Sequence, residues 1–324
     1  MPFPTSVTDI IATTIQSRSK QIADNVTKNN ALLARLNQRG NIRTISGGNT
    51  ILEELSFAEN GNAGFYSGYD LLPVATQDVI SAAEFSIKQL ACPVVMSGLE
   101  MLQNSGKEAF IDLLEARINV AEATMANKLA QSIYSDGTGS SGKEVTGLNA
   151  AVPAAPTTGT YGGIDRATWT FWRSQLYDFS AATVTPSATT IQAGLNTLWA
   201  SLVRGSDRPD LIILDNTYWS YYMSSLQALQ RFSDPSTGSL GFPSLKFMDA
   251  DVVLDGGIGG YCPAATGFML NTKYISLRPH KDRNMVSLSP NKRYAINQDA
   301  EVQILAWAGN LTCRGAQFQG RIQN

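Results

Sequence analysis

Residues 90–139, LACPVVMSGLEMLQNSGKEAFIDLLEARINVAEATMANKLAQSIYSDGTG, decide the fold, because a strand, a short turn and one long helix follow each other without interruption. Ser105 and Glu108 have the spacing of a capping box, which predicts that the helix begins there. Asp136 and Gly137 predict its end. Such a helix spans about 40 Å at about 1.5 Å per residue. Its apolar residues recur every three or four positions and predict one continuous buried stripe: Phe110, Leu113, Leu114, Ile118, Ala121, Met125, Leu129 and Ile133.

Five features resemble, in their order and spacing, the major capsid proteins of tailed bacteriophages (the Hong Kong phage-type capsid fold), whose subunit is organised around one long spine helix. They are the apolar strand ending at Ser97, the turn at 99–102, the long helix, the turn at 136–139 and the Gly147-Leu148-Asn149 that follows. The resemblance implies an α+β capsid fold with an N-terminal arm (1–44), an extended β-hairpin loop (45–89), a peripheral domain with the spine helix (90–142), an axial α/β domain (143–282), a return strand of the peripheral domain (283–312) and a C-terminal strand near the axial domain (313–324).

Composition is consistent with a subunit that buries large areas against its neighbours. Charged residues make up 16% of the chain and hydrophobic residues 43%, against about 25% charged residues in an ordinary soluble protein. An uncharged, β-rich protein of another kind has the same composition, so this alternative stays open. The first residues, MPFPTSVTD, lack the pattern of a secretory signal, and no apolar run is long enough for a membrane span. Three widely spaced cysteines, Cys92, Cys262 and Cys313, predict buried thiols in a reducing compartment.

The N-terminal segment is basic and has a thin apolar stripe. Residues 6–38 follow a helical period, and Gly40 predicts the end of the helix. Because such a helix is marginal alone, we expect its partner surface on another subunit. Its charged residues are mostly basic, with only Asp9 and Asp24 opposing Arg18, Lys20, Lys28, Arg35, Arg39 and Arg43.

Two strands, 49–58 and 79–95, flank ENGNAGFYSGYD (59–70), and we interpret the whole as an extended hairpin whose tip reaches a neighbouring subunit. Two alternatives stay open: a hairpin packed within its own domain, and charged faces that are merely solvated. The hairpin is acidic, and a basic arm beside it suits head-to-tail contact. No lysine lies between Ile45 and Ile87, so we expect no lysine cross-link from the hairpin. The suspected intersubunit contacts are Arg35, Arg39, Arg43, Glu53, Glu54, Glu59, Phe65, Tyr66, Tyr69 and Asp70.

Further along, the pattern predicts a loop-like boundary at 143–166, a helix at 187–204, a buried strand at 211–214, a helix at 216–231 and strands at 245–254 and 266–271. Strand signal then dominates residues 286–322. This alternation predicts an α/β or α+β domain followed by a long returning strand.

No chemical site stands out, and we expect no catalytic residue, cofactor or metal. The single histidine, His280, lies in a polar loop without a GxSxG elbow. Residues 256–260 lack the spacing of a phosphate loop. Asp136 and the pair Asp251 and Asp255 could suggest a cation site, but Asp-Gly turns explain two of these three residues. The aromatic run predicts core or interface packing rather than base stacking: Trp169, Phe171, Trp172, Tyr177 and Phe179.

The resemblance therefore implies a structural protein, the major capsid subunit of a tailed phage, made in the host cytoplasm and located in the virion capsid. It would assemble with itself into hexamers and pentamers of an icosahedral shell and contact the enclosed double-stranded DNA weakly and non-specifically. A portal and a separate scaffold are expected partners, unless no scaffold is needed, and a decoration protein stays open. The alternatives are a bacterial nanocompartment shell and, from another class, an α/β hydrolase-like enzyme using His280.

Overall fold

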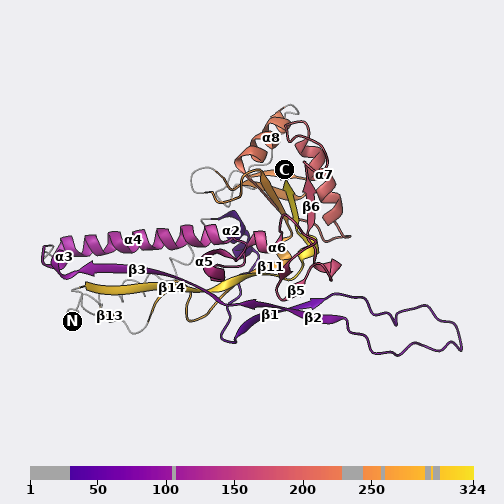
Figure 1. Cartoon of the computed structure of the whole chain (residues 1–324), viewed down its shortest axis with the longest axis horizontal. Helices are drawn as coiled ribbons and strands as arrows, with labels where there is room; N and C mark the ends of the chain where they lie inside the picture. Colours follow the sequence, from indigo (N-terminus) through magenta and orange to yellow (C-terminus); the bar gives the residue numbers. More distant parts are fainter. Residues whose placement is uncertain (1–29, 104–106, 228–243, 257–259, 289–292, 295–299) are drawn as a thin grey trace.

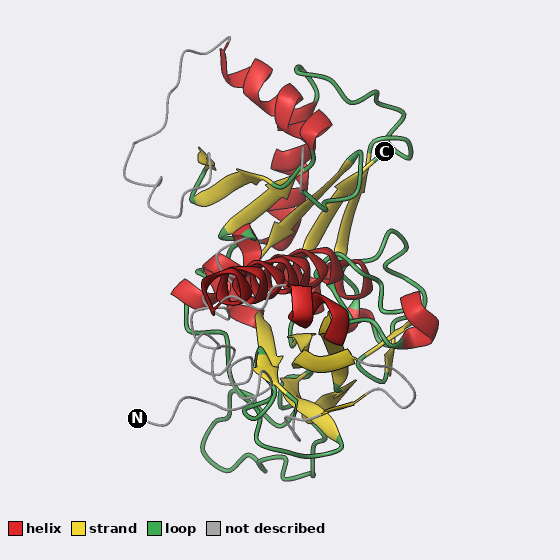
Figure 2. Ribbon diagram, turned by 90° about the vertical axis from the view of Figure 1, so that its left-hand side faces the viewer, coloured by secondary structure: helices red, strands yellow, loops and turns green. Residues whose placement is uncertain are grey.

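The computed structural model describes residues 30–103, 107–227, 244–256, 260–288, 293–294 and 300–324. These residues form an α+β fold with three recognisable parts (Figure 1). A long, thin body carries the spine helix α4 and the strands β3 and β14, a second α/β part stands on one end of this body, and a hairpin projects from the same end. Figure 2 shows the sheet of the second part above the spine helix and the strands of the body below it.

The spine helix α4 covers Lys107–Ser132, and its 26 residues span about 39 Å at about 1.5 Å per residue. The predicted stripe is confirmed from Ile118 onward, because Ile118, Ala121, Met125, Leu129 and Ile133 are all buried. The expected capping residue Ser105 lies outside the described residues. A short helix α3 (Gly98–Gln103) precedes the spine helix.

The Gly147-Leu148-Asn149 motif satisfies the end of the spine helix. The last carbonyls of a helix have no intrahelical partner. Here Gly147 N donates to Ser135 O at 3.1 Å and Leu148 N to Ile133 O at 2.6 Å, while the Asn149 side chain donates to Tyr134 O at 2.5 Å. A Cβ at Gly147 would lie 2.2 Å from Ile133 O, so only glycine allows this approach. Two short turns adjoin the motif: α5 (Gly139–Gly142) and α6 (Leu148–Ala151).

The peripheral sheet is built on β14 (Ala300–Cys313). Along one side it pairs antiparallel with all ten residues of β3 (Lys88–Ser97). Along the other side three strands follow one another: β11 (Ile275–Pro279), β12 (Val286–Ser287) and β13 (Arg293–Tyr294). Alternate residues of β3, Val94 and Met96, are buried on the side of the spine helix. The long returning strand expected from the sequence is therefore confirmed.

The second α/β part, for which we keep the expected name axial domain as a label, holds a six-stranded sheet in the order β6-β15-β10-β7-β9-β8. Its strands are β6 (Gln175–Asp178), β7 (Leu211–Leu214), β8 (Ser244–Phe247), β9 (Ala250–Leu254), β10 (Thr266–Leu270) and β15 (Gly320–Gln323). One face packs on α7 (Ile191–Leu202) and α8 (Asn216–Gln227) through Ile212, Leu214 and neighbours. The other face, with Leu211 and Ile213, joins the main core. The expected single strand at 245–254 is wrong, because the chain turns at Met248, with φ of 51°, into an antiparallel pair.

The hairpin consists of β1 (Thr50–Ser56) and β2 (Ile80–Ser86), with Ile51 opposite Phe85. The second expected strand, 79–95, breaks at Ile87, where β2 ends and β3 begins. The two halves belong to different sheets, because β2 pairs with β1 and β3 pairs with β14.

The arm contains α2 (Ala31–Gln38), which Asn30 caps by accepting from Leu32 N at 2.9 Å. Gly40, with φ of 68°, ends it as expected. Its apolar face lies in this chain's own core, where Ala31, Leu32, Leu33 and Leu36 are buried. The expectation of a partner surface on another subunit is therefore wrong for residues 31–38, and residues 6–29 lie outside the described part.

The segment expected as a loop boundary, 143–166, is largely irregular but packs into the core through Val145, Leu148 and Tyr161. Tyr161 stacks on Trp172, whose Nε1 donates to Tyr161 O at 2.9 Å. Phe179 is also buried, so core packing explains that part of the aromatic run. The remaining short elements are β4 (Thr160–Tyr161), β5 (Ile164–Asp165), and the 3-10 turns η1 (Thr170–Trp172), η3 (Thr272–Tyr274) and η4 (Ala316–Phe318).

All three cysteines are free thiols, with Cys313 buried and the other two partly buried. Burial raises the pKa of the Cys313 thiol to about 12. Among the described residues, no helix has both the length and the apolar character needed to cross a membrane.

Candidate intersubunit surface

The foot of the hairpin belongs to the subunit's own core. One face of the two strands is buried there through Ile51, Leu55, Ala83 and Phe85. The Phe85 ring meets Tyr161 edge-on at 5.1 Å between centroids. Because a slip of one residue would turn this apolar face outward, burial fixes the register of the two strands. The alternative of a hairpin packed within its own domain thus holds for the foot alone.

Beyond the strands, the loop of residues 57–79 leaves the body of the molecule (Figure 1). It carries large apolar side chains that the chain itself does not cover. Phe65 and Tyr69 are fully exposed, and Leu71 and Val74 are more than nine-tenths exposed. Asp70 accepts a hydrogen bond from Ser67 N at 2.8 Å, which closes a local turn at the tip. Several large apolar side chains exposed on one loop are typical of a protein interaction site.

Glu53 anchors the hairpin to the body. Strand alternation directs it inward, where it is 5% exposed. Its Oε1 accepts from Arg278 Nε at 2.7 Å and from Thr312 Oγ1 at 2.9 Å. A buried carboxylate requires such a cation and hydrogen bonds. The neighbouring Glu54 points the other way and has no ion pair among the described residues.

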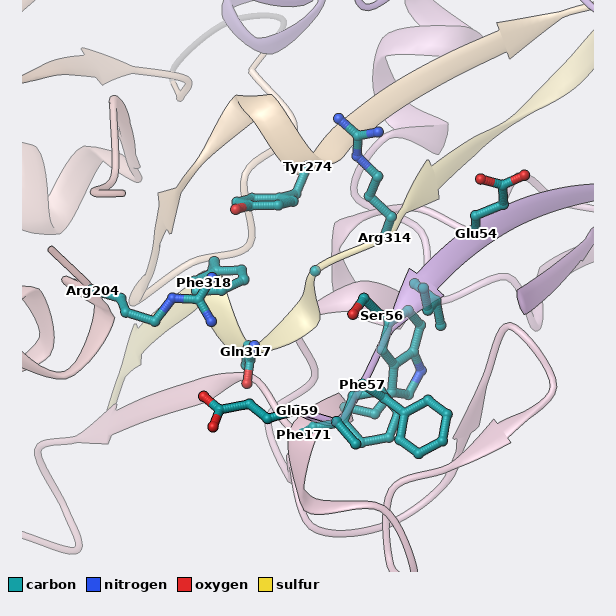
Figure 3. Close-up of a pocket in the computed structure, with 14 residues that line it drawn as sticks. Glu54, Ser56, Phe57, Glu59, Phe171, Arg204, Tyr274, Arg314, Gln317 and Phe318 are labelled. Carbon is teal, nitrogen blue, oxygen red and sulfur yellow. The ribbon is translucent and has the colours of Figure 1, made fainter. Parts of the chain in front are cut away.

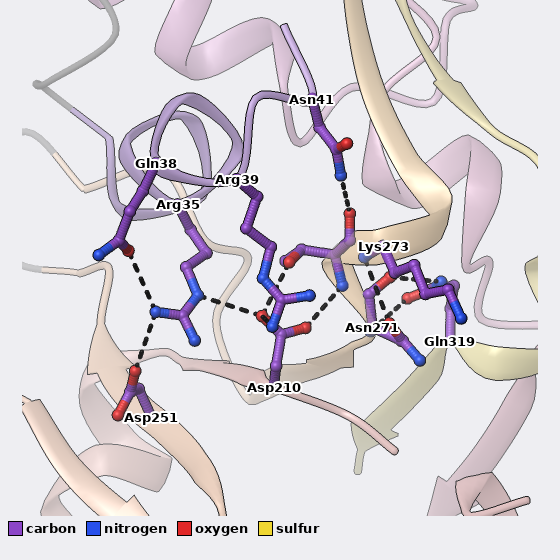
Figure 4. A network of polar contacts seen from close by, with 10 residues as sticks. Arg35, Gln38, Arg39, Asn41, Asp210, Asp251, Asn271, Lys273 and Gln319 are labelled. Atoms are coloured by element: carbon purple, nitrogen blue, oxygen red, sulfur yellow. Dashed lines mark hydrogen bonds and ion pairs between the residues drawn. The ribbon is translucent and has the colours of Figure 1, made fainter. Parts of the chain in front are cut away.

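The arm helix is fixed to the axial domain by a second ionic cluster (Figure 4). Arg35 contacts Asp210 at 3.1 Å and Asp251 at 3.3 Å, and Arg39 contacts Asp210 at 3.2 Å. Asp210 also accepts from the backbone and the hydroxyl of Thr272, each at 2.7 Å. Asp210 lies next to β7 and Asp251 lies in β9, so the cluster joins α2 to the axial sheet.

Asp255 links three parts of the chain. It accepts from Asn30 Nδ2 at 2.9 Å and from the Tyr134 hydroxyl. Burial raises the pKa of the Tyr134 phenol well above its ordinary value, so the phenol stays protonated and donates.

Asp136 accepts hydrogen bonds from Thr138, and these hydrogen bonds lower the pKa of the Asp136 carboxyl. Within the described ranges, no group of three His, Cys, Asp or Glu side chains could hold a metal ion.

A cavity of about 540 Å³ lies between the foot of the hairpin and the axial domain (Figure 3). Glu54 and Glu59 line one side of it. On the other side Tyr274 stacks on Phe318, with ring centroids 4.6 Å apart, and Arg204 lies over the Phe318 ring at 4.6 Å. Ring stacking and ion pairs within the chain hold these side chains in place, so the cavity is present before any partner binds.

The ten suspected intersubunit residues thus divide into two groups. Arg35, Arg39 and Glu53 have ionic partners inside the chain: Asp210, Asp251 and Arg278. These partners were missed by sequence reasoning, since no local signal connects residues about 175 or 225 positions apart. The second group is exposed and has no ion pair to the rest of the described chain: Arg43, Glu54, Glu59, Phe65, Tyr66, Tyr69 and Asp70. For this group the intersubunit role stays a prediction.

His280 does not have the environment of a catalytic base. Its Nδ1 accepts from Asp282 N at 3.2 Å, whereas a catalytic triad needs Nδ1–H to donate to a carboxylate. Residues 257–259 of the glycine run lie outside the described part.

The fold of this chain, with its spine helix along a long-stranded sheet, its projecting hairpin and its separate second sheet, matches solved structures of phage capsids. Among solved structures, the cyanophage A-1(L) capsid asymmetric unit matches with a TM-score of 0.60 at 18% identity, covering 89% of this chain and 92% of that chain. A Mycobacterium phage Bobi structure matches with a TM-score of 0.55 at 13% identity over 88% and 89% of the two chains. The capsid of a native GTA particle matches with a TM-score of 0.54 at 11% identity over 90% and 89%. No protein-family model and no curated protein matches the sequence.

Proposed function

We propose that this chain is the major capsid subunit of a tailed phage, and that it assembles in many copies into an icosahedral shell of hexamers and pentamers. The observation that carries the proposal is the loop of residues 57–79, in which Phe65, Tyr69, Leu71 and Val74 are each more than nine-tenths exposed. The capsid fold of the whole subunit supports it.

The loop and the surface that receives it are different patches, so the contact between copies is head-to-tail and closes into rings. Burying one Leu, Val or Phe side chain contributes about 1.5–3 kcal/mol. Part of this gain offsets the entropy lost on association. Each contact is therefore modest, and the many repeated contacts of a shell supply its stability.

The shell encloses double-stranded DNA, and the chain is located in this shell of the virion. A net charge of −2 gives no overall attraction to DNA, so contact with the packaged genome is weak and non-specific. Portal and scaffold proteins are separate partners, and the role is structural rather than enzymatic. A nanocompartment shell is not favoured, because the similar structures are phage and GTA capsids.

Assembly of the purified chain tests the proposal. Sedimentation velocity over a range of concentrations should show capsomers or larger particles, and Leu71→Ser with Val74→Ser should shift the distribution toward monomer. Both residues are exposed, so this variant should keep the circular dichroism spectrum of the wild type. A wild-type chain that sediments only as a 34.9 kDa monomer at high concentration would contradict the proposal.

A further inference from the structure

The strand β3 is an edge strand, and its free side carries backbone groups that a second chain could pair with. Among the described residues, it pairs with β14 along one side and with no strand along the other. Unpaired edges of this kind are templates for strand addition and aggregation. The segment 89–97, QLACPVVMS, adds to the hazard, because it is uncharged and rich in β-forming residues.

The orientation of the edge follows from Pro93. In an antiparallel pair, the N–H and C=O groups of alternate residues point to the same side. Proline has no N–H, so within a sheet its nitrogen faces the unpaired side. Residues 89, 91, 93, 95 and 97 therefore present their backbone groups to the free edge. Their side chains share the face opposite the spine helix, where Val95 is 43% exposed.

At three of these outward positions one backbone group is unable to pair with a second chain. Pro93 offers no donor. The Val95 carbonyl accepts from Arg117 Nη1, which reaches it from the spine helix. Ser97 N donates to Glu100 Oε2 at 3.1 Å. Arg117 and Glu100 in turn form an ion pair at 2.5 Å, so one clamp from α3 and α4 covers the end of the strand.

We propose that Pro93 and the Arg117–Glu100 clamp protect the edge of β3 against strand addition by a second copy of this chain. Copies of the chain then contact one another through side chains, such as those of the loop of residues 57–79, and not through a sheet that extends from one copy to the next. The groove beside the clamp, about 390 Å³ between residues 92–95 of β3 and residues 116–124 of α4, keeps its apolar lining accessible while the backbone is closed.

The test compares aggregation of the full chain with and without the edge protection. Pro93→Thr restores a donor and Arg117→Gln releases the Val95 carbonyl, so the double variant can form two more interchain hydrogen bonds. We expect its aggregation, followed by thioflavin fluorescence, to be about tenfold faster than that of the wild type. Adding Val95→Lys, which places a charge on the exposed face of the edge, should return the rate to that of the wild type.

Met125→Ala is the matched control, since it weakens the packing of α4 without opening the edge. Unfolding measurements place the variants on one stability scale. The proposal is overturned if the double variant aggregates no faster than the wild type, or if Met125→Ala aggregates equally fast at equal stability. These readouts do not depend on shell formation, so they stand apart from the proposed capsid function.

Discussion

Replacing Arg278 by methionine should destabilise the subunit by about 3 kcal/mol, because it leaves the Glu53 carboxylate buried without its cation. Glu53 is 5% exposed, and Arg278 Nε is 2.7 Å from its Oε1. Without Arg278, the Thr312 hydroxyl at 2.9 Å is the one partner left to the carboxylate within the described part of the chain. The Arg278 side chain is 18% exposed, so water partly replaces it, which places the loss at the lower end of the range for buried pairs.

The pair can be separated from simple packing by a double-mutant cycle. Glu53→Gln together with Arg278→Met removes both charges and should lie within about 1 kcal/mol of the wild type, giving a coupling of about 2 kcal/mol. Glu54→Gln, one position along and exposed, is the control and should change stability by less than about 0.5 kcal/mol. Urea unfolding monitored by tryptophan fluorescence measures all five chains: the wild type, Arg278→Met, Glu53→Gln, the double variant and the Glu54→Gln control. If Arg278→Met lowers the free energy of unfolding by less than about 1 kcal/mol, or if the cycle gives no coupling energy, then the buried ion pair does not stabilise the subunit as proposed.

Three further predictions follow from the same contacts. Met125→Ala should lower the free energy of unfolding by about 2–5 kcal/mol, whereas Val120→Ala on the exposed side of the same helix should lower it by under about 1 kcal/mol. Equal losses would contradict the burial of one side of the spine helix. Deleting residues 59–70 should leave the unfolding free energy nearly unchanged but abolish shells, and normal shells from this variant would exclude the tip as an intersubunit contact. A hydrogen bond from the Tyr274 hydroxyl, the larger cause, and one from Lys273 lower the pKa of Asp207. The stability that the charged Asp207 contributes is therefore present above the unfolded-state pKa of about 3.9, and it is lost as the pH falls through the lower folded-state pKa. Asp207→Asn should therefore cost about 1 kcal/mol at pH 7 and much less at low pH, and an equal loss in urea unfolding at both would show that the charge is not involved.

The parts of the fold that could be predicted are those with a local signal. The spacing of Ile118, Met125 and Leu129 identifies the buried stripe of the spine helix because helical periodicity is a property of neighbouring residues. The alternation of Ile51 and Leu55 likewise gives the buried face of β1.

The parts that could not be predicted depend on contacts between distant residues. The pattern of residues 79–95 is continuous, and it breaks at Ile87 only because β1 and β14, far apart in sequence, each pair with one half. The thin stripe of α2 indicated an external partner, yet Leu32 and Leu36 reach the core of the same chain. Nothing local shows that Glu53 belongs to Arg278 rather than to a neighbour. The tip of the loop is exposed, as its glycine, asparagine and tyrosine content leads one to expect, and the intersubunit role of its residues stays a prediction.

Electron microscopy of the purified chain shows whether it forms a shell. We expect rings, tubes or closed shells built from repeated copies, and their loss when residues 59–70 are deleted while the monomer stays folded. A field of dispersed, folded monomers for the wild-type chain at high concentration would contradict the claim that this protein is a shell subunit.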